Sequence, residues 1–229
     1  MCDSTVLETW NPDSYPAGVD TILERLKNSE IAEDCAESKI SVLVSKRKVR
    51  AFHFTRLTAS EECYIRTKGL FTATEENLEL RLNRAVNDGH LVETLKNRIL
   101  GNTVYRDPSQ SDCRIGAFWM GCYPLEANPC CNMLLKYWGG ESAYWKLEDT
   151  AALEKIGNPR IIEILIPFFD LANSSCVARS IVATKVGGVP GPIHQSYYDL
   201  ITKKRIPCSC IVAIHDVESY EKRWRNSRC

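Results

Sequence analysis

The sequence predicts an α+β fold, and two observations favour it. Strand-like and helix-like segments alternate along the 229 residues without the regular strand–helix–strand units of a doubly wound sheet. The sequence has no internal repeats. Its hydrophobic content of 44% and charged content of 25% are those of an ordinary globular domain. We expect one large domain over residues 46–229, preceded by an N-terminal arm and helical appendage over residues 1–45.

Two kinds of apolar spacing define the expected elements. Apolar residues three and four apart predict helices, whereas β-branched or alternating apolar runs predict strands. A capping box from Thr58 to Glu61 opens one helix, and Gly69 closes it. In chain order we expect a helix over Val19–Leu26, strands over Ile40–Val44 and Val49–Leu57, helices over Thr58–Lys68, Thr72–Val86 and Leu91–Ile99, a strand over Ile115–Met120, short helices over Asn132–Tyr137 and Thr150–Ile156, strands over Arg160–Pro167 and Ser209–Ile214, and a charged helical tail from Glu218.

Glu163 stands inside the most apolar run of the chain, Ile161–Pro167. In a strand it shares one face with Ile161 and Leu165, while the intervening isoleucines occupy the other face. A buried polar group without a partner costs about 1–3 kcal/mol, and a charge costs more. Two interpretations are therefore open: the face of Glu163 is solvated, or the carboxylate is kept for chemistry.

Charge and composition limit the classes of function. Lysine plus arginine and aspartate plus glutamate both number 29, so only a local basic groove could attract nucleic acid. No apolar run reaches the roughly 18–20 residues of a membrane span, and Met1–Ser4 does not open a secretory signal. We expect a cytoplasmic protein without a membrane partner. Its 11 cysteines include no CxxC pair, so we expect reduced thiols and no metal.

Three segments occur in an order that resembles a known enzyme family. His53 and Thr55 end a strand, and the following helix runs through Ile65 to Gly69-Leu70. Further on, Phe118-Trp119 is followed by Asn132-Met133-Leu134, and then by the strand Ile162–Pro167 with its glutamate. These segments resemble the opening motif, the aromatic and Met-Leu segments, and the glutamate-bearing strand of the DNA-modifying ADP-ribosyltransferase toxins. The family usually has a histidine or similar residue where Arg56 stands, and residues 1–45 lie outside the resemblance.

The resemblance implies an ADP-ribosyltransferase-like split β-sheet core with flanking helices, and NAD+ as a substrate. It implies that Glu163 is catalytic and that an arginine after the Gly69-Leu70 turn assists it. Arg81 and Arg84 both qualify by position. Glu141, which follows two glycines, is the rival acid.

ADP-ribose transfer breaks the bond between nicotinamide and ribose, and positive charge builds on the sugar as in glycoside hydrolysis. A semi-buried carboxylate such as Glu163 would stabilise that charge, hold a ribose hydroxyl or accept the proton of the incoming nucleophile.

The other parts of the NAD+ molecule would meet residues of the first two segments. His53 and Thr55 share a strand face and are expected to hydrogen-bond the ribose and the nicotinamide amide. One of the arginines Arg56, Arg81 and Arg84 could bind the pyrophosphate or hold the nucleophile. An aromatic ring, such as that of Phe118, Trp119 or Tyr137, could stack on the nicotinamide ring.

We therefore expect an NAD-dependent ADP-ribosyltransferase that attaches ADP-ribose to nucleic acid, as single-stranded DNA or RNA, and releases nicotinamide. Such an enzyme would be a bacterial toxin or phage-defence effector, and a toxin implies a neutralising antitoxin protein. Two alternatives stay open: transfer to a protein acceptor, which the neutral net charge favours, and a non-catalytic binding module on the same fold.

Overall fold

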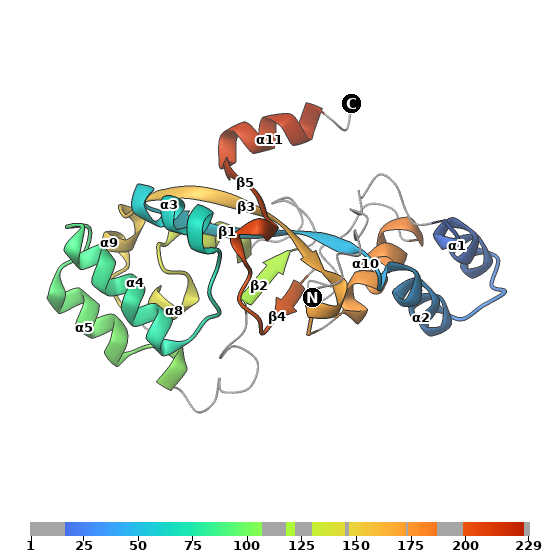
Figure 1. Cartoon of the computed structure of the whole chain (residues 1–229), viewed down its shortest axis with the longest axis horizontal. Coiled ribbons are helices and arrows are strands. Elements are labelled where there is room, and N and C mark those ends of the chain that lie inside the picture. Colours follow the sequence, from blue (N-terminus) through green and yellow to red (C-terminus); the bar gives the residue numbers. More distant parts are fainter. Residues whose placement is uncertain are drawn as a thin grey trace, which may run out of the picture. The chain divides into compact units, whose positions relative to one another are not determined.

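Helices and strands are mixed along the chain in the computed structural model, which describes residues 17–106, 118–121, 130–144, 147–172, 174–186 and 199–226 (Figure 1). The α-helices are α1 (Val19–Lys27), α2 (Glu33–Val44), α3 (Ala59–Lys68), α4 (Glu75–Asn87), α5 (Glu93–Gly101), α7 (Cys130–Lys136), α8 (Glu141–Tyr144), α9 (Ala151–Glu154), α10 (Ser175–Val186) and α11 (Val217–Asn226). The strands are β1 (Lys48–Leu57), β2 (Phe118–Gly121), β3 (Asn158–Pro167), β4 (Asp199–Thr202) and β5 (Ile211–Asp216). Short 3-10 turns are η1 (Val104–Arg106), η3 (Phe168–Asp170) and η5 (Cys208–Cys210). The α+β prediction is confirmed.

The strands form a five-stranded sheet in the order β4-β2-β1-β3-β5. β1 pairs with β2 in antiparallel fashion, with Phe52 opposite Gly121. The predicted strands Val49–Leu57, Arg160–Pro167 and Ser209–Ile214 correspond to β1, β3 and β5. β3, which carries Glu163, lies between β1 and β5 in this order.

The chain divides into two compact units, each assembled from separate stretches of sequence. Unit 1 comprises Met1–Phe52, Trp119–Ala127 and Ile164–Thr202, and unit 2 comprises His53–Phe118, Asn128–Glu163 and Lys203–Cys229. The expected boundary between residues 45 and 46 falls inside unit 1. Residues 1–16 of the expected N-terminal arm lie outside the described part of the chain.

Unit 1 contains the one predicted element that has the wrong type. The run Ile40–Val44 is the last part of helix α2, not a strand. Its β-branched content suggested a strand, but Ala36, Ile40 and Val44 follow one another at intervals of four, and all three are buried. Helix α2 packs against α1 and α10, so tertiary packing of this apolar face outweighs strand propensity.

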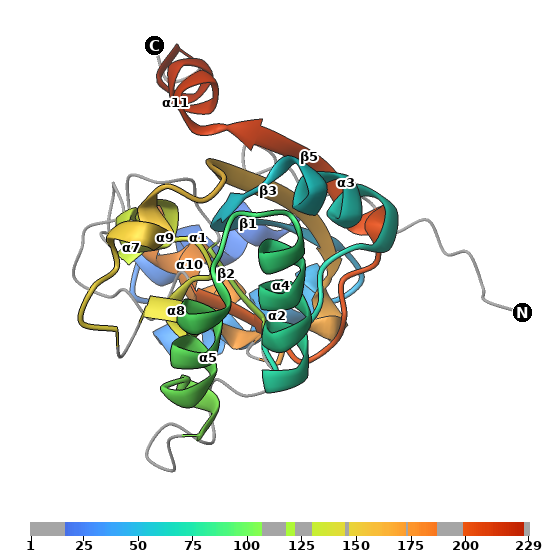
Figure 2. The same ribbon diagram turned by 90° about the vertical axis from the view of Figure 1, so that its left-hand side faces the viewer.

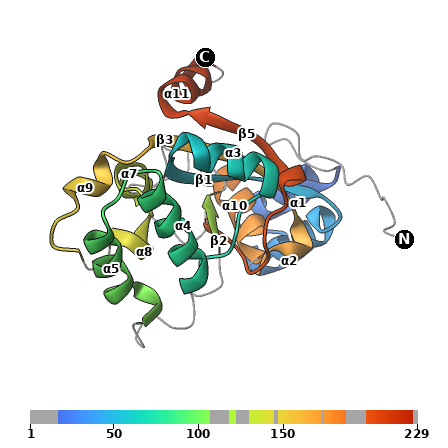
Figure 3. The same cartoon turned by 60° about the vertical axis from the view of Figure 1, so that its left-hand side comes forward.

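The helical part of unit 2 has its own apolar core. Helices α4 and α5 lie side by side (Figures 2 and 3). Trp138, Leu82 and Leu153 are fully buried at the centre of this core. The predicted capping box is confirmed: Glu61 N donates to the Thr58 hydroxyl, and Thr58 N donates to the Glu61 carboxylate. Within the described residues, no helix combines the length and apolar character needed to cross a membrane.

Candidate active site

Glu163 is buried near the middle of β3, with a side chain 9% exposed. Its Oε2 lies 2.8 Å from Nε2 of His215 on β5, and the His215 side chain is only 13% exposed. An ionised carboxylate can only accept hydrogen bonds, so Nε2 carries the proton of this bond whenever Glu163 is charged. The solvated interpretation of the Glu163 face is therefore wrong: the carboxylate is buried and has an imidazole partner.

His215 is the functional candidate that the sequence analysis missed. The predicted strand ended at Ile214, two residues before the observed end of β5 at Asp216. Strand alternation places His215 on the same face as Ala213 and Ile211, and extension of the strand by one residue would have included it. The Tyr220 ring of α11 packs on His215, with 4.7 Å between ring centroids.

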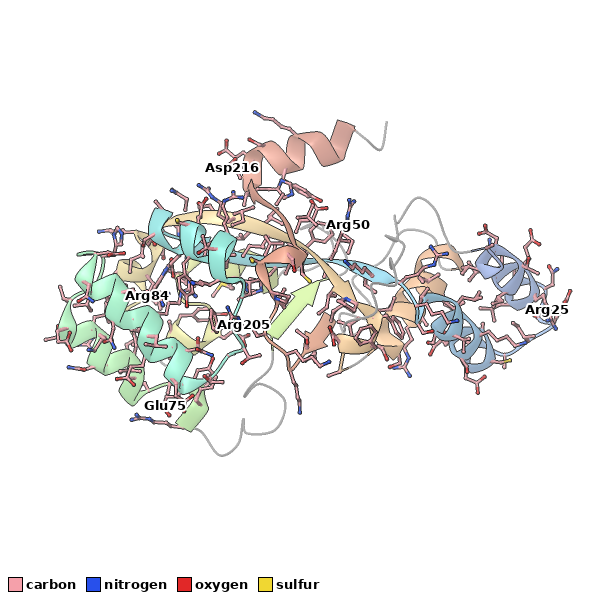
Figure 4. The ribbon with its side chains drawn as sticks, in the orientation of Figure 1. Arg25, Arg50, Glu75, Arg84, Arg205 and Asp216 are labelled. Atoms are coloured by element: carbon pink, nitrogen blue, oxygen red, sulfur yellow. The ribbon has the colours of Figure 1, made fainter. Side chains whose placement is uncertain are left out.

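Asp216 marks the change from β5 to α11 (Figure 4). Its Oδ1 accepts a hydrogen bond from the backbone N–H of Ser219 at 3.1 Å, which is the geometry of a helix N-cap. This backbone hydrogen bond is the chief cause that lowers the pKa of Asp216 below its ordinary value. The cap lies at the last residue of the strand, next to His215, and starts the helix that brings Tyr220 to the imidazole.

A second set of contacts ties β5 to β3 on the opposite sheet face. Arg160 of β3 donates from Nε to Glu62 of α3 at 2.6 Å and from Nη1 to Asp216 at 3.4 Å. Arg160 and Glu163 are three residues apart and point to opposite faces of β3, as His215 and Asp216 do on β5. Glu62 places α3 on the Arg160 face, so the Glu163–His215 pair lies on the face away from α3.

His53 and Thr55 belong to β1, the strand next to β3. His53 is half-buried and Thr55 is buried. The Thr55 hydroxyl donates to the Arg56 carbonyl at 3.3 Å. The structure thus brings the two polar residues of the first segment onto the strand beside that of Glu163. Their contacts with a ribose or an amide remain predictions.

Arg56 is held by three backbone carbonyls. Its Nε donates to Ile156 at 3.0 Å, Nη1 to Leu135 at 3.2 Å and Nη2 to Gly157 at 2.7 Å. Burial lowers the pKa of Arg56, and the charge of Glu154 opposes this shift. Three of its five N–H groups are used in these bonds. The contacts favour a structural role for Arg56, as a link between β1 and the turn that precedes β3, over the expected contact with pyrophosphate.

That turn also requires a glycine. Gly157 has φ +61°, and a Cβ atom on it would lie 2.4 Å from the carbonyl carbon of Leu57. The left-handed conformation and the close approach both exclude a side chain without rearrangement. Gly157 and Arg56 together fix the start of β3 against the end of β1.

The structure separates the two candidate arginines. Arg81 donates from Nε to Glu61 Oε1 at 2.5 Å and from Nη2 to the Arg56 carbonyl at 3.0 Å. Its guanidinium carbon also lies 4.7 Å from the ring centroid of Trp138, and the Trp138 indole N–H donates to Glu61 at 2.9 Å. Burial raises the pKa of Glu61, but the charge of Arg81 and hydrogen bonds from Arg81, Thr58 and Trp138 together bring it below its ordinary value. Arg81 is therefore part of a structural network.

Arg84 has different neighbours. Its guanidinium carbon lies 3.8 Å from the ring centroid of Tyr64 on α3. Among the residues that the structure describes, Arg84 forms no ion pair with a carboxylate, whereas Arg81 does. Tyr64 stacks in turn on Phe71, with 5.7 Å between centroids, and Arg205 lies 4.3 Å from the Phe71 centroid. We call Arg84, Tyr64, Phe71 and Arg205 the basic–aromatic stack.

Glu141 opens helix α8 after Gly139 and Gly140, which have φ values of +88° and +62°. It is half-buried, and α8 packs against α5 and η1. Burial is the main cause that raises the pKa of Tyr105 in η1, and the charge of Glu141 adds to it, while Ser142 and Arg81 oppose it. The rival acid thus belongs to the helical part of unit 2, whereas Glu163 has its partner on β5.

The last two site predictions fall on β2. Phe118 and Trp119 are part of this strand, but their side chains lie outside what the structure describes, so their stacking on nicotinamide remains a prediction.

Over the described ranges, no group of three or more His, Cys, Asp or Glu side chains is arranged to hold a metal ion. No protein-family model, no curated protein and no solved structure matches this chain.

Proposed function

We propose that the chain is an NAD-dependent ADP-ribosyltransferase with nucleic acid as its acceptor and Glu163 as its catalytic carboxylate. The observation that carries the proposal is the buried Glu163–His215 pair, with 2.8 Å between Oε2 and Nε2, on adjacent strands. A carboxylate held in a region of low dielectric exerts a strong field on a nearby cation. The three sequence segments that resemble ADP-ribosyltransferases support the choice of NAD+ as the substrate.

The proposed reaction exchanges one bond at ribose C1′ for another and moves one proton. The bond between ribose C1′ and the nicotinamide nitrogen breaks, and nicotinamide leaves with the bonding electron pair. A lone pair of the acceptor forms the new bond to C1′, and Glu163 accepts the proton that the acceptor loses. Between these events the ribose carries positive charge, which the Glu163 carboxylate stabilises.

His215 serves this chemistry by holding the carboxylate. A hydrogen bond to a charged group contributes about 1.5–3 kcal/mol, which offsets part of the cost of keeping Glu163 charged in a buried place. The bond also fixes the direction of the carboxylate, so that the group does not reorient when charge develops on the sugar.

Arg84 is the arginine that this proposal retains for the substrate, since Arg81 is bonded to Glu61. His53 and Thr55 keep their proposed contacts with ribose and nicotinamide. The biological role that fits such an activity is a bacterial toxin or phage-defence effector with an antitoxin as its partner.

Transfer of label from NAD+ tests the proposal. NAD+ labelled in its adenosine half is incubated with the full chain and with separate pools of single-stranded DNA, RNA and protein. We expect label in a nucleic-acid pool and an equal amount of free nicotinamide. E163Q should lower kcat/KM at least 100-fold, the usual lower range for loss of a proton-transferring group. E79Q, which changes an exposed glutamate of α4, is the matched control and should behave as the wild type.

Each outcome has one meaning. Label in the protein pool alone would assign a protein acceptor. Full activity of E163Q would remove the catalytic role of Glu163, and the same substitution at Glu141 would then test the rival acid. If the wild-type chain consumes no NAD+ with any of the pools, the interpretation that remains is a non-catalytic binding module.

A further inference from the structure

The basic–aromatic stack places two guanidinium groups at the two ends of a ladder of rings. Arg84 lies on Tyr64, Tyr64 on Phe71, and Phe71 under Arg205 (Figure 4 labels both arginines). The three steps of 3.8, 5.7 and 4.3 Å limit the separation of the two guanidinium carbons to about 14 Å. Stacking on an aromatic face restricts the motion of a guanidinium, so less freedom is lost when it binds a ligand.

Two stretches far apart in the sequence build this ladder. An isolated antiparallel bridge joins Leu70 to Ile206, with N–O distances of 2.8 and 2.9 Å. Arg205 also donates to the carbonyl of Lys68 at the end of α3. Gly69 makes the crossing close, because a Cβ atom on it would lie 2.1 Å from the Ile206 carbonyl oxygen. The bridge therefore sets Arg205 over Phe71.

The same two stretches concentrate positive charge. Residues 63–74 and 203–215 of unit 2 contain no aspartate or glutamate. Their exposed basic side chains are Arg66, Lys68, Lys203, Lys204 and Arg205. This part of unit 2 is therefore locally basic. The formal net charge of +0 for the whole chain conceals this local excess of positive charge.

We infer that the surface formed by the basic–aromatic stack and the exposed basic side chains around it binds the backbone and bases of single-stranded nucleic acid. Arginine forks match phosphate geometry, and the clustered lysines add charge along the strand. Unpaired bases stack on guanidinium planes, here those of Arg84 and Arg205 at the two ends of the stack, which the bases of a duplex cannot do while paired. Leu80, 55% exposed and one helical turn before Arg84, extends the surface with an apolar side chain. The inference rests on the proposed function only in one respect: the bound strand would be the acceptor.

Binding is measured by fluorescence anisotropy with labelled 20-nucleotide single strands of mixed sequence, as DNA and as RNA, at several salt concentrations. E163Q is used for this assay so that no transfer takes place. On this background, R84Q/R205Q should weaken binding at least tenfold. It should also lower the salt slope by about 1.4, because each phosphate contact to a single strand contributes about 0.7. R98Q, which removes one exposed arginine of α5, is the control and should change neither quantity.

A second variant avoids any disturbance of the stack. K203Q/K204Q changes two exposed lysines of the same surface and should also weaken binding and lower the salt slope. Single-strand affinity that is unchanged in both double variants overturns the inference, and so does tighter binding of poly-glutamate or of duplex DNA than of either single strand. Strand binding by a wild-type chain that never cleaves NAD+ would support this surface and reject the proposed function. NAD+-dependent transfer by the wild type, together with strand binding that neither double variant weakens, would support the proposed function and reject this surface.

Discussion

The substitution E61Q tests whether Arg81 is structural, as its contacts indicate. Glu61 Oε2 accepts from Thr58 N at 2.8 Å and from Trp138 Nε1 at 2.9 Å, while Oε1 accepts from Arg81 Nε at 2.5 Å. A glutamine can keep its single oxygen at the first position, but its amide group then faces the Arg81 donor. The variant should therefore lose one charged hydrogen bond, which corresponds to about 1.5–3 kcal/mol of unfolding free energy.

The loss should depend on pH, and its direction follows from the pKa of Glu61. In the folded chain this pKa is lowered from 4.5, so the stabilisation is complete above pH 4.5 and is lost as pH falls through the folded value. Glutamine does not titrate in this range. The difference in unfolding free energy between wild type and E61Q should therefore be largest near pH 7. It should shrink as the pH falls and Glu61 becomes protonated in the folded chain.

Urea denaturation followed by tryptophan fluorescence at pH 7, 5 and 3 measures this gap. E79Q on the exposed face of α4 is the control and should stay within about 0.5 kcal/mol of the wild type. R81M should be destabilising by itself, and its effect should not add to that of E61Q, because both remove the same bond. A gap below about 0.5 kcal/mol at pH 7, or one of equal size at pH 3, would refute this account of Arg81.

Three other changes should have effects of known direction. G157A should lower the unfolding free energy by about 2–4 kcal/mol, since a left-handed backbone costs about 1–3 kcal/mol and the added Cβ meets Leu57; a stability equal to wild type in urea denaturation would contradict the close approach. R56Q should lower the unfolding free energy by roughly 2 kcal/mol in the same assay, because an uncharged amide cannot donate to all three carbonyls. Unchanged stability would contradict the structural role of Arg56 and favour the expected contact with pyrophosphate. H215F should lower kcat for NAD+ cleavage about 10–100-fold with little change in KM, while H215Q, which can still donate to Glu163, should retain most of kcat; equal rates for the two variants would show that the hydrogen bond has no part in catalysis.

Local signals in the sequence predicted most of the elements that build the candidate site. The alternation of Val49–Leu57, the capping box at Thr58 and the apolar run around Glu163 each act over a few residues, and β1, α3 and β3 follow them. The prediction of a strand at Ile40–Val44 was wrong because the same residues fit both a β-branched strand and one face of an amphipathic helix. The packing of α2 on α1 and α10 favours the helix.

Long-range pairing was beyond the sequence. Nothing local distinguishes Arg81 from Arg84, yet one meets Glu61 and the other meets Tyr64. His215 becomes the partner of Glu163 only because β5 lies next to β3 in the sheet. The basic surface was hidden in the same way, since its two stretches lie more than 100 residues apart and meet at the Leu70–Ile206 bridge.

The order in which unit 2 is assembled has a consequence for the protein during its synthesis. Its third stretch, Lys203–Cys229, supplies both Ile206 to Leu70 and His215 to Glu163. Glu163 and His215 are 52 residues apart, and a ribosome that adds about 5–20 residues per second needs roughly 3–10 s to make that interval. Over this time the nascent chain has Glu163 without His215, and Tyr64 and Phe71 without Arg205. The Glu163–His215 pair and the basic–aromatic stack would then be completed together, once residues 203–215 have been made.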